Sequence, residues 1–185
     1  MLIEVRFHGR GGQGVVTAAD FLAVAGFKEG YYTLSFPTFG AEKRGTPVAS
    51  FLRISDEPIV VRDEIYTPDY VVVLDPSVFE SVNVVSGLKQ NGMLIANYPK
   101  GSEDLKMDLK IKGKVLTVNA TKLSMKILGR PITNTAMVGA LVGATGILKL
   151  ETLKETIEEL FEGSLAEKNK QLIEEAYNYM RGMCR

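Results

Sequence analysis

The spacing of apolar and polar residues along the chain predicts strands that alternate with helices. Residues 2–7 alternate apolar and polar side chains, as a strand does, whereas the apolar residues of 15–28 recur at helical spacing. Residues 70–75, "YVVVLD", form a continuous β-branched run, which is typical of a strand buried on both faces in a parallel sheet. Further strands are predicted at 31–36, 92–97 and 114–119, and helices at 77–90 and 120–128.

A β-hairpin interrupts this alternation after the second strand. Its arms are residues 47–54 and 57–62, and its turn lies at Ser55 and Asp56. We therefore expect a doubly wound α/β fold with a mostly parallel sheet, an inserted hairpin and C-terminal helices. The absence of repeats, low-complexity segments and linkers favours a single domain over residues 1–185.

The end of the chain is predicted to be helical. One helix begins after Pro131, and residues 152–155, "TLKE", and 164–167, "SLAE", match the capping-box pattern that precedes amphipathic helices. Small residues recur at every fourth position after Pro131, namely Ala136, Ala140 and Ala144, and also Gly139 and Gly143. Such faces let another backbone approach closely, either within the chain or in a partner subunit.

Composition and charge indicate an ordinary soluble, cytoplasmic protein. Hydrophobic residues make up 45% of the chain, and Lys+Arg and Asp+Glu each number 22, which gives a net charge of zero. No overall field would attract nucleic acid or an anionic membrane, so neither is expected as a partner. The N-terminus lacks a signal-peptide pattern, and the most apolar stretch, residues 136–148, is too short to span a bilayer.

Several classes of catalytic chemistry are excluded by the residue inventory. The single cysteine, Cys184, excludes an internal disulfide, a cysteine-based zinc site and an iron–sulfur cluster held by this chain alone. His8 is the only histidine, so a histidine-based triad or a multi-histidine metal site is excluded as well. No carboxylate cluster has metal-ligand spacing, and we assign this chain no catalytic and no metal-binding residue.

The first candidate binding element is the glycine loop "HGRGGQG", residues 8–14, between a predicted strand and a predicted helix. Backbone N–H groups of Gly11, Gly12 and Gly14 can approach an anion at the start of that helix. A dinucleotide fingerprint also needs a carboxylate about 20 residues later, but the second strand ends in "LSF". The alternative is that the glycines only permit a tight turn. The candidate residues of the loop are Gly9, Arg10, Gly11, Gly12, Gln13 and Gly14.

The second candidate element is the loop "FPTFGAEKRGTPV", residues 36–48, which carries Glu42, Lys43 and Arg44 between two glycines. Both loops follow neighbouring strands, and doubly wound folds place their sites at the carboxyl ends of strands. We therefore expect one surface that accepts an anion or contacts a partner. The alternative is a charged loop in solvent.

Taken together, these stretches resemble the gamma subunit of the 2-oxoacid:ferredoxin oxidoreductases, especially the pyruvate and 2-ketoisovalerate enzymes. The resemblance rests on "HGRGGQG", "FPTFGAEKRGTPV", "VVVLDPS" and "RPITNTAMVGALVGATG", in this order, and spans nearly the whole chain. It identifies no established catalytic residue in this chain. The motifs look closest to the pyruvate group, but they do not determine which 2-oxoacid is the substrate.

The resemblance implies a complex that oxidatively decarboxylates a 2-oxoacid to acyl-CoA and CO2 while it reduces ferredoxin. In that family thiamine diphosphate, with magnesium, lies between the alpha and beta subunits, and the iron–sulfur clusters belong to the beta and delta subunits. The chain would then be a ligand-positioning or structural subunit beside alpha, beta and delta partners, inactive alone, with coenzyme A as the co-substrate of the complex. The main alternative is a free-standing Rossmann-type nucleotide-binding module, and a third reading is a purely structural scaffold.

Overall fold

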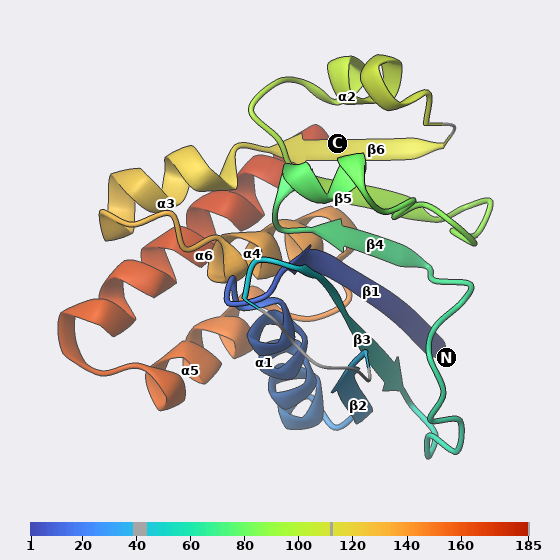
Figure 1. Ribbon diagram of the computed structural model, residues 1–185. Helices are drawn as coiled ribbons and strands as arrows, with labels where there is room; N and C mark the ends of the chain where they lie inside the picture. Colours follow the sequence, from blue (N-terminus) through green and yellow to red (C-terminus); the bar gives the residue numbers. More distant parts are fainter. Residues whose placement is uncertain (39–43, 112, 185) are drawn as a thin grey trace.

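The computed structural model describes residues 1–38, 44–111 and 113–184, and Figure 1 shows its elements. The strands are β1 (Leu2–Arg10), β2 (Tyr32–Pro37), β3 (Pro47–Ser55), β4 (Tyr70–Val73), β5 (Met93–Asn97) and β6 (Lys114–Val118). The helices are α1 (Val15–Lys28), α2 (Ser102–Leu109), α3 (Ala120–Leu128), α4 (Asn134–Thr145), α5 (Leu150–Leu160) and α6 (Gly163–Met183), with the 3-10 helix η1 (Pro76–Glu80).

Within the described residues, six strands form one sheet in the order β2-β3-β1-β4-β5-β6. β1, β4, β5 and β6 pair in parallel, whereas β3 is antiparallel to both β1 and β2. The predicted α/β fold with a mostly parallel sheet and C-terminal helices is confirmed. The inserted hairpin differs from the predicted one: its arms are β2 and β3, and β3 lies between β2 and β1 (Figure 1).

The predicted second arm of the hairpin, residues 57–62, is wrong, because this segment forms no strand. The backbone N–H of Asp56 donates to the carbonyl of Met1 (3.3 Å), so the chain does not fold back along β3 at this point. Nη1 of Arg53 donates a hydrogen bond to the carbonyl oxygen of Val61 (3.3 Å). An arginine side chain thus replaces the strand partner that the alternating sequence suggested.

The predicted helix over residues 77–90 is also wrong, because only η1 forms there and turns follow it. The carbonyl oxygens of Val84 and Ser86 accept hydrogen bonds from Nη2 of Arg6, at 2.8 and 2.6 Å. Gly87 has a φ of 73°, and a Cβ placed on it would lie 1.9 Å from a backbone carbonyl oxygen. These long-range contacts require an irregular backbone that a helix cannot supply.

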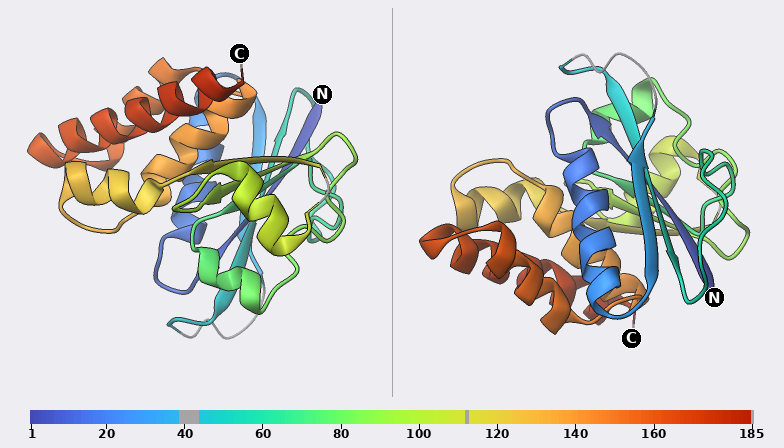
Figure 2. Two further views of the ribbon diagram at one scale, coloured as in Figure 1. Left: turned by 90° about the horizontal axis from the view of Figure 1, so that it is seen from above. Right: turned by 90° about the horizontal axis from the view of Figure 1, so that it is seen from below.

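The sheet separates two layers of unequal thickness (Figure 2). α1 and α3–α6 cover one face and form the larger core with Val5, Phe7 and Leu52 of the sheet. η1, the turns after it and α2 cover the other face of β4, β5 and β6, around Val71 and Leu94. α1 therefore leaves β1 toward one face, whereas η1 leaves β4 toward the opposite face.

α4 is a buried helix between the sheet and α6, and nine of its residues are buried. A Cβ on Gly139 would lie 2.4 Å from the carbonyl oxygen of Ile173, and one on Gly143 would lie 2.3 Å from that of Tyr177. The expected close approach of a backbone to the glycine face is confirmed, and the approaching backbone is that of α6 in the same chain.

Candidate functional site

The glycine loop lies where β1 ends and α1 begins, at the carboxyl edge of the parallel strands (Figure 1). Gly14 caps α1 with a φ of 78°, a left-handed conformation that favours glycine. A Cβ on Gly14 would lie 2.7 Å from Nδ2 of Asn134, at the start of α4, and one on Gly9 would lie 2.6 Å from Cγ2 of Val15. Both glycines are therefore required by the packing around the turn, whatever else the loop does.

Arg10 fastens the glycine loop to the turn after β4. Its Nε donates to Oγ of Ser77 (2.6 Å) and its Nη2 to the carbonyl oxygen of Ser77 (3.2 Å). Its Nη1 donates to the carbonyl oxygen of Gly45 (3.0 Å), in the second candidate loop. The guanidinium thus spans three segments, and its hydrogen bonds are to groups of this chain.

Gln13 makes a matching connection to Asp75, at the end of β4. Its Oε1 accepts from the backbone N–H of Arg10 (2.8 Å), and its Nε2 donates to Oδ2 of Asp75. The other carboxylate oxygen of Asp75 accepts from the backbone N–H of Ser77 (2.8 Å). Burial alone would raise the pKa of Asp75, but the hydrogen bonds from Gln13 and Ser77, with nearby Arg10, hold it below its ordinary value.

Asp75 belongs to this site and was not among the residues that the sequence suggested. The signal for it is its position, because it follows the buried run 70–74 directly and precedes Pro76. A polar residue that ends a buried parallel strand lies at the edge where such folds place their sites.

The two candidate loops lie together, as predicted. The backbone N–H of Gly11 donates to the carbonyl oxygen of Thr46 (2.9 Å), and the N–H of Gly45 donates to that of Gly11 (3.1 Å). Gly12, with a φ of 89°, faces Arg44, whose Cγ lies 3.7 Å from the position of a Cβ on Gly12. The N–H of Gly11 is therefore already hydrogen-bonded within the protein. Of the three backbone N–H groups predicted to bind an anion, those of Gly12 and Gly14 remain.

Arg44 is the exposed cation at this edge. Across the described ranges it has no ion pair with a carboxylate, in contrast to the fully hydrogen-bonded Arg10. Glu42 and Lys43 lie outside the described residues. The described part of the candidate surface therefore consists of the glycine loop, Arg44 and the turn that carries Asp75.

The start of α4 closes the same edge from the helical side. Oγ1 of Thr133 donates to the carbonyl oxygen of Leu74 (3.4 Å), and Nδ2 of Asn97 donates to the same oxygen (2.9 Å). Because α1 and η1 leave β1 and β4 toward opposite faces, the ends of these strands form a topological switch point, the position at which doubly wound folds bind ligands. The edge at this position has backbone donors and an exposed guanidinium, so it can accept an anion.

His8 has no role as a proton carrier at this edge. It is buried, and its Nε2 accepts a hydrogen bond from Nε of Arg6 (3.0 Å). Burial, with a smaller effect from the Arg6 guanidinium, lowers the pKa of His8 to about 3, so the imidazole is neutral at physiological pH. Its available lone pair is occupied by a structural hydrogen bond.

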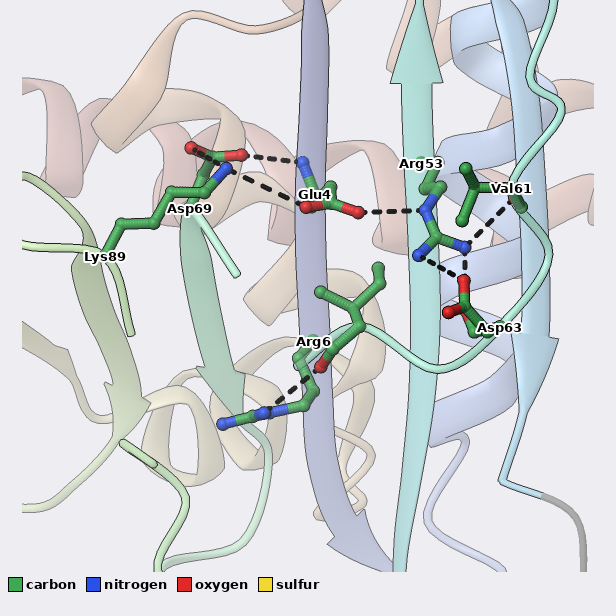
Figure 3. A network of polar contacts seen from close by, with 8 residues as sticks. Glu4, Arg6, Arg53, Val61, Asp63, Asp69 and Lys89 are labelled. Atoms are coloured by element: carbon green, nitrogen blue, oxygen red, sulfur yellow. Dashed lines mark hydrogen bonds and ion pairs between the residues drawn. The ribbon is translucent and has the colours of Figure 1, made fainter. Parts of the chain in front are cut away.

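Arg6 belongs, with Glu4 and Arg53, to a polar ladder on the sheet face opposite the larger core (Figure 3). Glu4 accepts from Nε of Arg53 (2.9 Å), and Nη1 of Arg53 donates to the carbonyl oxygen of Asp63 (2.8 Å). Nη1 of Arg6 donates to the carbonyl oxygen of Ile65 (3.2 Å). The ladder anchors the irregular segment between β3 and β4, and it lies away from the glycine loop.

Residues 1–38, 44–111 and 113–184 hold no group of three or more His, Cys, Asp or Glu side chains placed to bind a metal ion. The single cysteine, Cys184, is exposed and forms no disulfide. In the same ranges, no helix has the length and apolar character needed to cross a bilayer.

Comparison with known proteins places this geometry in context. A family model described as pyruvate ferredoxin/flavodoxin oxidoreductase matches residues 4–179. The pyruvate/ketoisovalerate oxidoreductases common subunit gamma of Thermococcus kodakarensis is 54% identical over 178 residues, with 96% of each chain covered. Pyruvate synthase subunit PorC of Methanocaldococcus jannaschii is 50% identical over 179 residues, with 97% of each chain covered.

Solved structures repeat the same fold. The crystal structure of pyruvate oxidoreductase subunit PORC from Thermotoga maritima superposes with a TM-score of 0.87 at 36% identity, and 96% of each chain is covered. In 2-oxoglutarate:ferredoxin oxidoreductase from Magnetococcus marinus the match covers 98% of this chain and 31% of the other, with a TM-score of 0.75 at 18% identity. There the fold is one part of a much longer polypeptide.

Proposed function

We propose, from the premise that this chain belongs to the pyruvate ferredoxin/flavodoxin oxidoreductase family, that its glycine-loop edge faces coenzyme A in the assembled enzyme. The chain is a gamma-type subunit, the PorC subunit, of a pyruvate or 2-oxoacid:ferredoxin oxidoreductase. The complex would oxidatively decarboxylate a 2-oxoacid, transfer the acyl group to coenzyme A, release CO2 and pass the electrons to ferredoxin. We infer pyruvate as a substrate, because one relative that covers nearly the whole chain is named for pyruvate alone and another is named as a common subunit for pyruvate and ketoisovalerate.

One observation carries the coenzyme A assignment. Two loops that are distant in sequence are joined by the Gly11, Gly45 and Thr46 hydrogen bonds, while Arg44 stays exposed beside Gly12. Arg10 and Gln13 hold this arrangement in place through bonds within the chain. Coenzyme A carries phosphates, for which a guanidinium and backbone N–H groups at the start of a helix are suitable donors.

The remaining cofactors of such a complex would be held by companion subunits. Thiamine diphosphate needs magnesium, and iron–sulfur clusters need several cysteines, but the described residues offer no metal-binding cluster and one exposed cysteine. We therefore assign thiamine diphosphate, magnesium and the clusters to alpha, beta and delta partners, and ferredoxin to the role of electron acceptor. This chain would bind and orient a ligand without forming or breaking a bond itself.

The rival function, a free-standing Rossmann-type nucleotide-binding module, is disfavoured by the sheet order. In a dinucleotide site, the second strand lies beside the first and ends in a carboxylate that holds the ribose. Here β3 separates β2 from β1, and the end of β2 at Ser35 and Phe36 carries no carboxylate. The ribose contact of that module therefore has no counterpart beside the glycine loop.

Substitution of Arg44 in the assembled complex tests the proposal. Arg44→Ala should raise the KM for coenzyme A about tenfold, as expected for one lost charge-assisted contact, with assembly intact. Arg62→Ala is the matched control, because Arg62 is exposed in the segment between β3 and β4. Steady-state kinetics with pyruvate, coenzyme A and a dye acceptor give the KM, and gel filtration reports assembly.

Two outcomes would contradict the coenzyme A assignment. Loss of assembly in Arg44→Ala would mean that Arg44 contacts a partner subunit instead of the ligand. Wild-type kinetics and assembly in both Arg44→Ala and Gly12→Val would mean that the two loops are only turns.

A further inference from the structure

A cavity of about 470 Å³ lies on the helical side of the glycine-loop edge, beyond Asn134. It is bounded by the start of α4, the connection from α3 to α4, the connection from α5 to α6 and the first two turns of α6, with Thr17 of α1 beside them. Leu128, Ile132, Phe161 and Leu165 form its apolar walls, and Arg130 and Lys168 supply its cations. Its volume falls within the range of small-molecule sites.

Two buried polar side chains form the base of this cavity, Thr135 and Asn169, and they are hydrogen-bonded to one another. Oγ1 of Thr135 donates to Oδ1 of Asn169 (2.9 Å), and Nδ2 of Asn169 donates to the carbonyl oxygen of Leu165 (2.9 Å). Both side chains are buried. The base therefore places no demand on a polar ligand, and an apolar group can lie against it without leaving hydrogen bonds unmade.

Large apolar side chains are exposed around the cavity. Ile132 and Leu165 are 45% and 49% exposed, respectively, although each contributes to its walls. Phe161, from the connection between α5 and α6, adds an aromatic ring. A ligand with a flat apolar body would remove this surface from water, which favours binding.

The cations of the cavity lack a carboxylate partner in the part of the chain that the structure describes. No acidic residue lines the cavity, and neither Arg130 nor Lys168 takes part in an ion pair. Lys170, two residues after Lys168 in α6, pairs with both Glu158 and Glu167. The free charge is thus a local feature of the cavity and not a general property of α6.

A second groove shows that this combination is distinctive. The groove between α3 and α6 also has apolar walls, but its Lys126 is paired with Glu175 at 3.3 Å. A carboxylate therefore lines that groove and pairs with one of its two lysines, and only Lys122 has no ion pair there, whereas among the described residues no carboxylate lines the cavity and both Arg130 and Lys168 remain available to a bound anion.

We propose that this cavity binds an organic anion with a flat apolar ring. The ring lies among Phe161, Ile132 and Leu165, and the anionic group meets Arg130 and Lys168. A nucleoside phosphate and an aromatic carboxylic acid share this chemistry. The cavity adjoins the coenzyme A edge through Asn134, but none of Gly11, Gly12, Arg44 and Asp75 lines it, so its test is independent of the function proposed above.

Two probes distinguish these sources in the full-length chain labelled with nitrogen-15. Adenosine 5′-monophosphate supplies a ring with a phosphate, and indole-3-acetate supplies a ring with a carboxylate. Saturable shifts of backbone amide signals from residues 130–135 and 161–168 should appear with at least one probe. The double variant Arg130→Glu and Lys168→Glu should weaken that binding by about tenfold or more.

The control is Lys122→Glu, which reverses the charge of one exposed lysine on α3, outside the cavity, and should leave the affinity unchanged. Binding of adenosine monophosphate alone would identify a phosphate site, and binding of indole-3-acetate alone would identify a carboxylate site. The proposal is overturned if neither probe shifts these amides, if the shifts appear only around residues 9–14, or if the double variant binds as tightly as the wild type.

Discussion

The guanidinium of Arg6 lies beneath the irregular segments on one face of the sheet and donates to the carbonyl oxygens of Ile65, Val84 and Ser86. Its Nε donates to Nε2 of His8, which must stay neutral to accept that bond. A buried cation is costly unless it is well hydrogen-bonded, and these four acceptors meet that need. The pair therefore couples the protonation of one imidazole to the attachment of two surface segments.

This coupling predicts a loss of stability on acidification. The folded pKa of His8 is about 3 against 6.5 for an unperturbed histidine, so between these values the unfolded chain binds a proton that the native chain does not. Stability therefore falls as pH falls through this window, by up to about 1.4 kcal/mol per pH unit, and is unaffected by His8 above it.

Urea unfolding between pH 5 and 7, where carboxylates stay mostly ionised, measures this effect. His8→Gln retains an acceptor for Arg6 but cannot titrate, so its free energy of unfolding should change less with pH than that of the wild type. Equal pH slopes for the two proteins would show that His8 is not held neutral in the fold.

Arg10 and Gln13 show what the sequence could and could not predict about single residues. Their place in a glycine loop between a strand and a helix correctly located the candidate edge. Their side chains, however, bind Ser77, Gly45 and Asp75, which are distant in sequence. Local pattern cannot distinguish a side chain that awaits a ligand from one that already has partners elsewhere in the chain.

At the scale of elements, the packing of α4 on α6 depends on the absence of side chains. The carbonyl oxygen of Tyr177 lies 2.3 Å from the position that a Cβ on Gly143 would occupy, which is too close for a real contact. Gly143→Ala should therefore destabilise the chain by about 1–3 kcal/mol through overpacking. Thermal unfolding of the purified chain measures the change.

Gly182→Ala is the matched control, because Gly182 lies in α6 with nothing within 4 Å of the added Cβ. That substitution should leave stability unchanged or raise it slightly, since alanine favours a helix over glycine. Equal melting temperatures for Gly143→Ala and the wild type would mean that α4 and α6 separate at no cost.

Elements with a strong periodic pattern were predictable, and those maintained by distant partners were not. The buried strand β4 and the C-terminal helices are confirmed, although β4 ends at Val73, because their patterns follow from burial in the sheet and core. The capping boxes predicted at 152–155 and 164–167 are wrong, because α5 and α6 already begin at Leu150 and Gly163, with no side-chain cap. α2 was missed because Leu105 is its only buried residue, which leaves no apolar periodicity to detect. The predictions of a strand at 57–62 and a helix at 77–90 were wrong, because carbonyl oxygens of these segments accept hydrogen bonds from Arg53 and Arg6.

For the whole molecule, we propose a subunit that positions a ligand for a reaction carried out together with companion subunits. The sheet brings the glycine loop, Arg44 and the Asp75 turn to one edge, and α4 closes that edge from the helical side. The only histidine is occupied by Arg6, and the described residues contain no metal-binding cluster. The chain should therefore contribute to the reaction only together with its companion subunits.

Recombination of purified subunits tests this central claim most directly. Pyruvate- and coenzyme A-dependent reduction of a dye acceptor is measured for the 185-residue chain alone, for the companion subunits alone and for the mixture. The account predicts no reduction by the isolated chain and full activity only in the mixture. Robust pyruvate-dependent reduction by the isolated chain, or full activity of the companion subunits without it, would contradict the account.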